Sequence, residues 1–262
     1  MRVSVSELDG DRPDLEAQWQ ALVAATAGTG TVLLVLPEMP FAPWLASTPE
    51  VDPSAWARAV DDHDRWCARL EELEVGVVVG TRPVVDRDRD GAGGRFNEGF
   101  VWVAGEGIVG RRRKTFLPDE PGFHEASWYA RGPVEFLPVT TPLGEIGLMI
   151  CTELWFPEHA RAMGERGIRL LAVPRATPVA TAEKWEAGTR VAAVTAGAFC
   201  LSTNRAGGTG AVTFGSGSVI VDPEGVVLAR TTATTPVASA DIDLRVADVA
   251  KTTYPRYVDA SR

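Results

Sequence analysis

Two kinds of hydrophobic pattern alternate along the chain. Short apolar runs rich in β-branched residues lack polar alternation, which predicts strands that are buried on both faces. We expect these strands at Arg2–Ser6, Thr31–Leu36, Val75–Gly80, Phe100–Ala104, Ile146–Ile150, Leu170–Val173, Phe199–Ser202, Ser218–Val221 and Ala238–Ile242. Helical patterns lie between them, at Pro13–Ala25, Ser54–Leu73, Pro157–Gly167 and Ala182–Gly197. Interleaved strands and helices predict a layered α/β fold.

The length and charge of the chain narrow its organisation and its partners. Its 262 residues suffice for one large domain, and we expect a single domain over residues 1–262, with no internal repeat. A net charge of −9 disfavours nucleic acid as a partner. No apolar run approaches the length of a membrane span, and the acidic start lacks a signal-peptide core. We therefore expect a cytoplasmic protein that binds neither nucleic acid nor membrane.

The cysteines and histidines form no recognisable metal or disulfide pattern. Cys67, Cys151 and Cys200 are widely spaced and odd in number, unlike a disulfide framework or a zinc site. With only three histidines in the chain, we expect no metal and no organic cofactor. Each cysteine alone is most simply a buried, inert thiol, so its context must distinguish a reactive one.

Three predicted strand ends carry a charged or reactive residue. Glu38 follows the run VLLVLP, Lys114 comes just after a strand and before a loop rich in proline and glycine, and Cys151 lies between an apolar strand and a helix. Ligand crevices form at strand ends in α/β proteins. A cation lowers the pKa of a thiol, a carboxylate can take its proton, and backbone N–H groups can stabilise an oxyanion. Singly these residues are ordinary surface charges or a core thiol, but together they predict a thiol hydrolase.

The order and context of these residues resemble the nitrilase, or carbon–nitrogen hydrolase, superfamily over essentially the whole chain. In that resemblance Glu38 is the catalytic base, Lys114 the catalytic lysine and Cys151 the nucleophile. The segment PDEPGFHEASWYARG is similar to the loop that holds a second, supporting glutamate, for which Glu125 is the match. The resemblance implies a four-layer αββα sandwich that usually forms a homodimer. It is nearest to the N-carbamoylputrescine amidase-like branch.

The sequence departs from that branch near the expected substrate site, in Thr152-Glu153-Leu154 and at Arg175. The guanidinium of Arg175 is suited either to pairing with a substrate carboxylate or to neutralising Glu153 or another carboxylate of the site. Both interpretations remain open from the sequence. The side chains expected to contact substrate are those of Thr152, Trp128, Trp155 and Arg175.

The function expected from these residues is hydrolysis of a small amide or carbamoyl compound through a thioester on Cys151, with release of ammonia or an amine. A first alternative is a nitrilase, because the Cys-x-Glu pattern at Cys151 resembles true nitrilases. The short stretch after DIDL, unlike the long extension common in filament-forming nitrilases, favours amides. A second alternative is a non-catalytic binding protein, which is disfavoured because a structural role does not require a thiol beside two charges.

Overall fold

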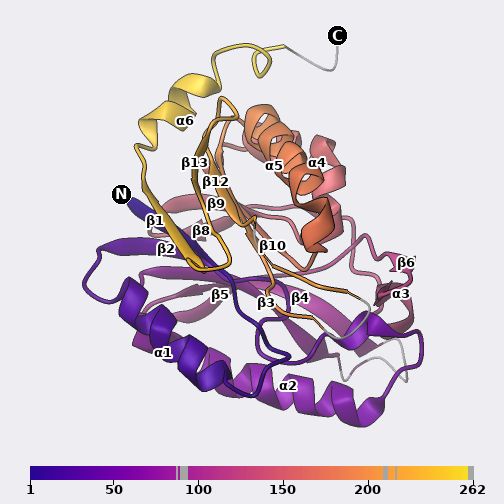
Figure 1. Ribbon diagram of the computed structural model, residues 1–262. Coiled ribbons are helices and arrows are strands. Elements are labelled where there is room, and N and C mark those ends of the chain that lie inside the picture. Colours follow the sequence, from indigo (N-terminus) through magenta and orange to yellow (C-terminus); the bar gives the residue numbers. More distant parts are fainter. Residues whose placement is uncertain (87, 89–93, 209–211, 216, 259–262) are drawn as a thin grey trace.

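Two six-stranded sheets lie face to face between two layers of helices (Figure 1). The computed structural model describes residues 1–86, 88, 94–208, 212–215 and 217–258. Side chains of both sheets meet in one buried cluster, and each sheet also packs against helices on its outer face. The four-layer αββα sandwich expected from the sequence is therefore confirmed.

The first sheet contains the N-terminal strands and has the order β14-β1-β2-β3-β4-β5. Its strands are β14 (Val237–Asp241), β1 (Arg2–Ser6), β2 (Thr31–Val35), β3 (Val77–Val85), β4 (Arg95–Val103) and β5 (Gly107–Arg113). The neighbours β1, β2 and β3 are parallel, while the other pairs are antiparallel. Parallel strands need crossover connections, which here contain α1 (Leu15–Thr26) and α2 (Pro53–Cys67).

The second sheet has the order β13-β12-β11-β10-β9-β8. Its strands are β13 (Val227–Arg230), β12 (Val219–Val221), β11 (Phe199–Asn204), β10 (Leu170–Arg175), β9 (Gly144–Leu148) and β8 (Val139–Thr141). The central strands β9, β10 and β11 are parallel. Their crossovers contain α4 (Pro157–Glu165) and α5 (Ala182–Ala196), which cover the outer face of this sheet. The carboxyl ends of β9 and β10 therefore meet at one edge.

Short elements connect the layers. They are the hairpin β6 (Asp119–Glu120) and β7 (Phe123–His124), the helices α3 (Glu125–Trp128) and α6 (Arg245–Ala250), and the 3₁₀ turns η1 (Leu45–Ser47), η2 (Leu70–Leu73), η4 (Cys151–Trp155) and η5 (Val179–Thr181). Throughout the ranges given above, no helix is long and apolar enough to cross a membrane.

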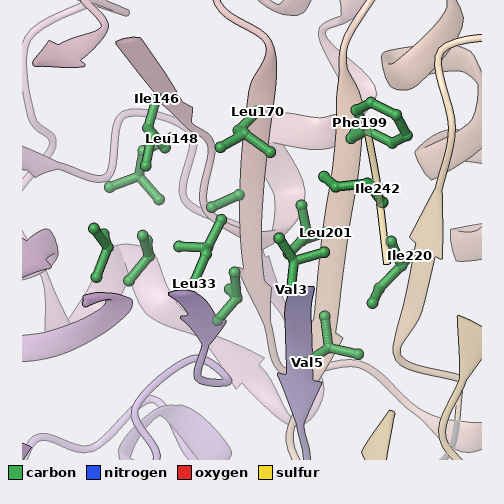
Figure 2. Close-up of a cluster of buried hydrophobic side chains, with 14 of the residues drawn as sticks. Val3, Val5, Leu33, Ile146, Leu148, Leu170, Phe199, Leu201, Ile220 and Ile242 are labelled. Atoms are coloured by element: carbon green, nitrogen blue, oxygen red, sulfur yellow. The ribbon is translucent and has the colours of Figure 1, made fainter. Parts of the chain in front are cut away.

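The core explains why the strands lack polar alternation. Figure 2 shows the cluster between the sheets, where Leu33 of β2 meets residues of the opposite sheet such as Leu201. The next residue, Leu34, points to the other face of β2 and packs beneath α1 and α2. Because successive side chains enter different apolar layers, both faces of the strand must be hydrophobic.

Several expected element boundaries are wrong. The helix expected over Ser54–Leu73 ends at Cys67, and a separate 3₁₀ turn, η2, follows. The apolar pattern stays in phase because Leu70 and Leu73 still pack on the sheet. Strand β4 begins at Arg95, five residues before Phe100, where the expected strand starts. Its Gly99 interrupts the apolar run because a side chain there would lie 2.7 Å from Leu148 of the facing sheet.

Candidate functional site

The structure brings Glu38, Lys114 and Glu125 into one buried cluster. Glu38 follows β2, Lys114 follows β5 directly, and Glu125 begins α3. The ammonium Nζ of Lys114 lies 2.8 Å from Glu38 Oε1 and 2.7 Å from each carboxylate oxygen of Glu125. None of the three side chains is more than 1% exposed to solvent. Buried charges of this kind persist only when they are paired, and here one ammonium serves two carboxylates.

The carboxylate of Glu38 is held at both oxygens. The side-chain amide of Asn97 donates to Oε1 at 2.7 Å, and the backbone N–H of Ala176 donates to Oε2 at 3.1 Å. The N–H of Glu38 itself donates to the carbonyl of Arg175 at 3.3 Å. These contacts come from both sheets, so they fix the orientation of a group suited to receive a proton.

Cys151 occupies a strained backbone position beside this cluster. It begins the turn η4 after β9, with a φ of 47°. A residue other than glycine rarely adopts such a φ, and strain of this kind is concentrated at functional sites. The thiol donates to the carbonyl oxygen of Ala176 at 3.7 Å. Ala176 therefore contacts both Cys151 and Glu38.

The electrostatics of the cluster leave the resting thiol protonated. Burial, together with the charge of Glu38, raises the pKa of Cys151 well above 9.0, although Lys114 acts in the opposite direction. Burial would lower the pKa of Lys114, but Glu125 and Glu38 outweigh it and raise that pKa well above 10.5. Burial also raises the pKa of Glu125, against the lowering effect of Lys114. Cys151 thus needs a base to become a nucleophile, while Lys114 is a permanent cation.

A second buried ion pair, between Arg112 and Glu153, is linked by hydrogen bonds to the residues next to Lys114 and Cys151. The carboxylate of Glu153 accepts the N–H of Thr115 at 2.7 Å and the N–H of Ile150 at 2.7 Å. Arg112 donates to both oxygens of this carboxylate, at 3.0 Å to Oε1. The sequence run RRRK did not indicate that Arg112 forms a buried ion pair. Successive side chains of β5 point to opposite faces of the strand, so neighbouring arginines differ in burial. The Arg112 side chain is 9% exposed, against 52% for Arg111.

A cavity of about 280 Å³ opens at Cys151. Thr152 and Trp155, both expected from the sequence to contact substrate, line it together with Glu125. The other lining residues are Pro118, Glu120, Phe123, Ala176, Thr177, Pro178, Thr181, Lys184 and Trp185. The volume is suited to a small molecule rather than a polymer.

Trp128, also expected to contact substrate, is not among the residues that line this cavity. Its side chain is 3% exposed, and its indole N–H donates to the carbonyl of Thr48 at 2.7 Å. It belongs to a buried apolar cluster that includes Trp44, Trp56 and Tyr129. The expectation of substrate contact is not supported at Trp128, because its ring is used in packing.

Arg175 ends β10 at the same sheet edge as Cys151, but its side chain is fully buried and does not line the cavity. It donates to Ser202 Oγ at 2.9 Å, to Thr177 Oγ1 at 2.6 Å and to the carbonyl of Gly217. Burial lowers its pKa to about 10. The partner of Glu153 is Arg112, so the pairing of Arg175 with Glu153 is wrong, while neutralisation of another carboxylate of the site by Arg175 stays a prediction.

Sequence reasoning missed the cavity residues that come from the start of α5, Lys184 and Trp185. They lie inside a helical pattern and follow no apolar strand. The available signal was the pair Lys-Trp in a segment otherwise rich in small residues. Within the described ranges, no group of three or more histidines, cysteines, aspartates or glutamates is placed to hold a metal ion.

Comparison with known proteins gives one family. The sequence profile described as "Carbon-nitrogen hydrolase" matches residues 5–252. The crystal structure of a carbon–nitrogen hydrolase from Helicobacter pylori superposes with a TM-score of 0.83 over 98% of this chain and 94% of that chain. The two sequences are 24% identical, so the likeness shows the fold alone.

Two curated relatives match parts of the chain. An N-carbamoylputrescine amidase from Arabidopsis thaliana is 33% identical over 111 residues, which is 42% of this chain and 36% of the relative. A citrullinase from Francisella tularensis is 25% identical over 178 residues, which is 67% of this chain and 61% of the relative. The matched segments therefore span less than two thirds of either relative.

Proposed function

Because the chain belongs to the carbon–nitrogen hydrolase family, we propose that it hydrolyses a carbon–nitrogen bond of a small amide or carbamoyl compound at Cys151. The observation that carries this proposal is the buried contact of 2.8 Å between Lys114 and Glu38, beside a cavity lined by Cys151. A cation and a base next to a thiol supply what acyl transfer needs. A buried charge cluster without such a role would only cost desolvation energy.

The first chemical step is attack on the substrate carbonyl. Glu38 accepts the proton of Cys151 as the sulfur forms a bond to the carbonyl carbon. The carbonyl electrons move to the oxygen, and the N–H of Thr152 and the Lys114 ammonium stabilise the resulting oxyanion. A well-placed donor of this kind contributes about 3–4 kcal/mol to the transition state. Because the thiol is protonated at rest, proton transfer and attack are coupled.

The second step breaks the carbon–nitrogen bond. The protonated Glu38 gives its proton to the leaving nitrogen, ammonia or an amine departs, and a thioester remains on Cys151. Water then attacks the thioester carbon as Glu38 accepts a water proton, and that proton returns to the sulfur when the acid product leaves. Glu125 binds the Lys114 ammonium through both oxygens and so positions it. Protein groups supply every proton transfer in this scheme.

Ammonia release from three compound classes tests the proposal. The purified protein is incubated with glutaramide, with 3-ureidopropionate and with butyronitrile, and ammonia is assayed. We expect release from the amide or the ureido compound and none from the nitrile. Release from the nitrile alone would identify a nitrilase, and the absence of release from all three would favour a binding protein. Either result would overturn the proposal.

We also propose that the protein is a cytoplasmic homodimer that acts without nucleic acid or membrane. The dimer rests on the family resemblance, and the net charge of −9 supports the absence of a nucleic-acid partner. Light scattering at micromolar concentration should give twice the mass of the chain, and the mass of a monomer would contradict the proposed dimer.

A further inference from the structure

Lys184 is a cation at the cavity, and none of the carboxylates that the structure describes pairs with it. It lies in the first turn of α5 and lines the cavity together with Cys151. Its Nζ is 5.5 Å from the ring centroid of Trp155, and the rings of Trp155 and Trp185 are 5.1 Å apart. Over the described ranges of the chain, Lys184 forms no ion pair. Its ammonium is therefore available to a ligand.

The other charged groups near the cavity are not placed to bind a ligand carboxylate. Glu125 is bound to Lys114 at 2.7 Å, and Arg175 lies outside the cavity with its guanidinium donating to interior oxygens. Glu120 lines the cavity from β6 and carries a negative charge. Glu120 would repel a ligand carboxylate and Lys184 would attract it. We therefore expect the carboxylate on the part of the cavity wall formed by Lys184.

The surroundings of Lys184 favour recognition of an anion over a merely solvated lysine. Contact with the face of Trp155 restricts the ammonium, because an aromatic ring attracts a cation held over it. The Lys184 side chain is exposed at the cavity wall, so an anionic ligand can reach it from solvent. The indoles of Trp155 and Trp185 also offer apolar area for a short carbon chain that links two polar ends.

We propose, building on the function above, that the substrate carries a carboxylate that Lys184 binds while its amide or carbamoyl group lies at Cys151. The substrates are thus short ω-amides or ureido compounds of carboxylic acids. The cation of the site that selects them is Lys184 rather than Arg175, since only Lys184 lines the cavity. Lys184 would then determine specificity and take no part in bond breaking.

Ligand binding to the Cys151→Ala protein tests this inference without turnover. Isothermal titration uses succinamate, glutaramate and adipamate, with the neutral glutaramide as the size-matched reference for glutaramate. We expect Lys184→Met to raise the Kd of the best-bound amic acid at least about tenfold, a loss of roughly 1.4 kcal/mol. The Kd of glutaramide should stay within about twofold, since it lacks the charge. Lys184→Arg should retain most of the affinity because it keeps the cation.

Arg166→Met is the matched control, because Arg166 is exposed and lies outside the cavity. It removes the same charge and should leave every Kd unchanged. Equal loss of affinity for amic acid and glutaramide in Lys184→Met, or no binding of any amic acid, would overturn the inference. Preferential binding of 4-aminobutanamide, lost in Glu120→Gln, would also overturn it by showing recognition of a cation. If amic acids bind through Lys184 but no amide is hydrolysed, only the proposed function fails.

Discussion

The carboxylate of Glu153 accepts a hydrogen bond from the backbone N–H of Thr115 at 2.7 Å. Its other oxygen accepts the N–H of Ile150 at 2.7 Å. One buried side chain therefore joins the residue after Lys114 to the residue before Cys151. The position of the ammonium relative to the thiol depends on this link, which Arg112 neutralises.

Removing Arg112 should destabilise the protein strongly. In Arg112→Met the Glu153 carboxylate, which is 0% exposed, loses its cation. Breaking a buried pair by removing one partner costs about 3–5 kcal/mol, so we expect a fall of that size in the free energy of unfolding in urea. Arg65→Met, at an arginine 67% exposed beside Asp62, serves as the control and should leave the midpoint unchanged. An unchanged midpoint for Arg112→Met would show that Glu153 is not held as described.

Removing the thiol should abolish turnover without unfolding the protein. We expect Cys151→Ala to release ammonia at least about 10³-fold more slowly than the parent, as for loss of other enzyme nucleophiles. Circular dichroism should show the parent fold, because the change is small. Cys67→Ala, at a partly buried thiol of α2 away from the cavity, should keep full activity. Comparable activity in both variants would reject Cys151 as the nucleophile.

His63 should make stability depend on pH below neutrality. Burial lowers its pKa to about 3, and its neutral ring accepts the N–H of Phe41 while Nδ1 donates to the Ala59 carbonyl at 2.7 Å. A lowered folded-state pKa means that the unfolded chain binds the extra proton first. This contribution is complete above the unfolded pKa of about 6.5 and is lost as the pH falls, by about 1.4 kcal/mol per unit.

Urea unfolding of the parent and of His63→Gln, between about pH 5 and 6.5, checks this effect. The parent should lose stability more steeply than the variant as the pH falls. Because the substitution also changes the packing around residue 63, the slope of the unfolding free energy against pH, and not its absolute value, is the readout. Parallel slopes would contradict a neutral buried His63.

The layers of the fold were predictable because each depends on a local pattern. Runs such as Thr31–Leu36 can bury all their apolar side chains only between two layers. The order of Glu38, Lys114 and Cys151 along the chain indicated the site. A strand before Lys114 was expected and is present as β5, but its run of arginines hides the alternation that buries Arg112. The burial of an arginine in a polar strand is recognised only when its carboxylate partner, here Glu153, is known.

The cavity wall was less predictable than the catalytic cluster. Arg175 was a reasonable candidate because it follows an apolar strand at the right sheet edge, but its side chain turns towards Ser202 of the neighbouring strand. Lys184 lines the cavity because of where α5 packs on the sheet. That position depends on contacts between residues far apart in the sequence. Periodicity assigns a residue to a helix face and does not say which cavity that face meets.

The central claim, acyl transfer through Cys151, is tested most directly by capturing the acyl group. An amide that the protein hydrolyses is mixed with it in the presence of hydroxylamine, and the hydroxamate product is quantified beside the ammonia. The account predicts that hydroxamate replaces part of the acid, and that acid-quenched protein carries the acyl mass on the Cys151 peptide. Ammonia release with no hydroxamate and with no acyl adduct on that peptide would contradict it.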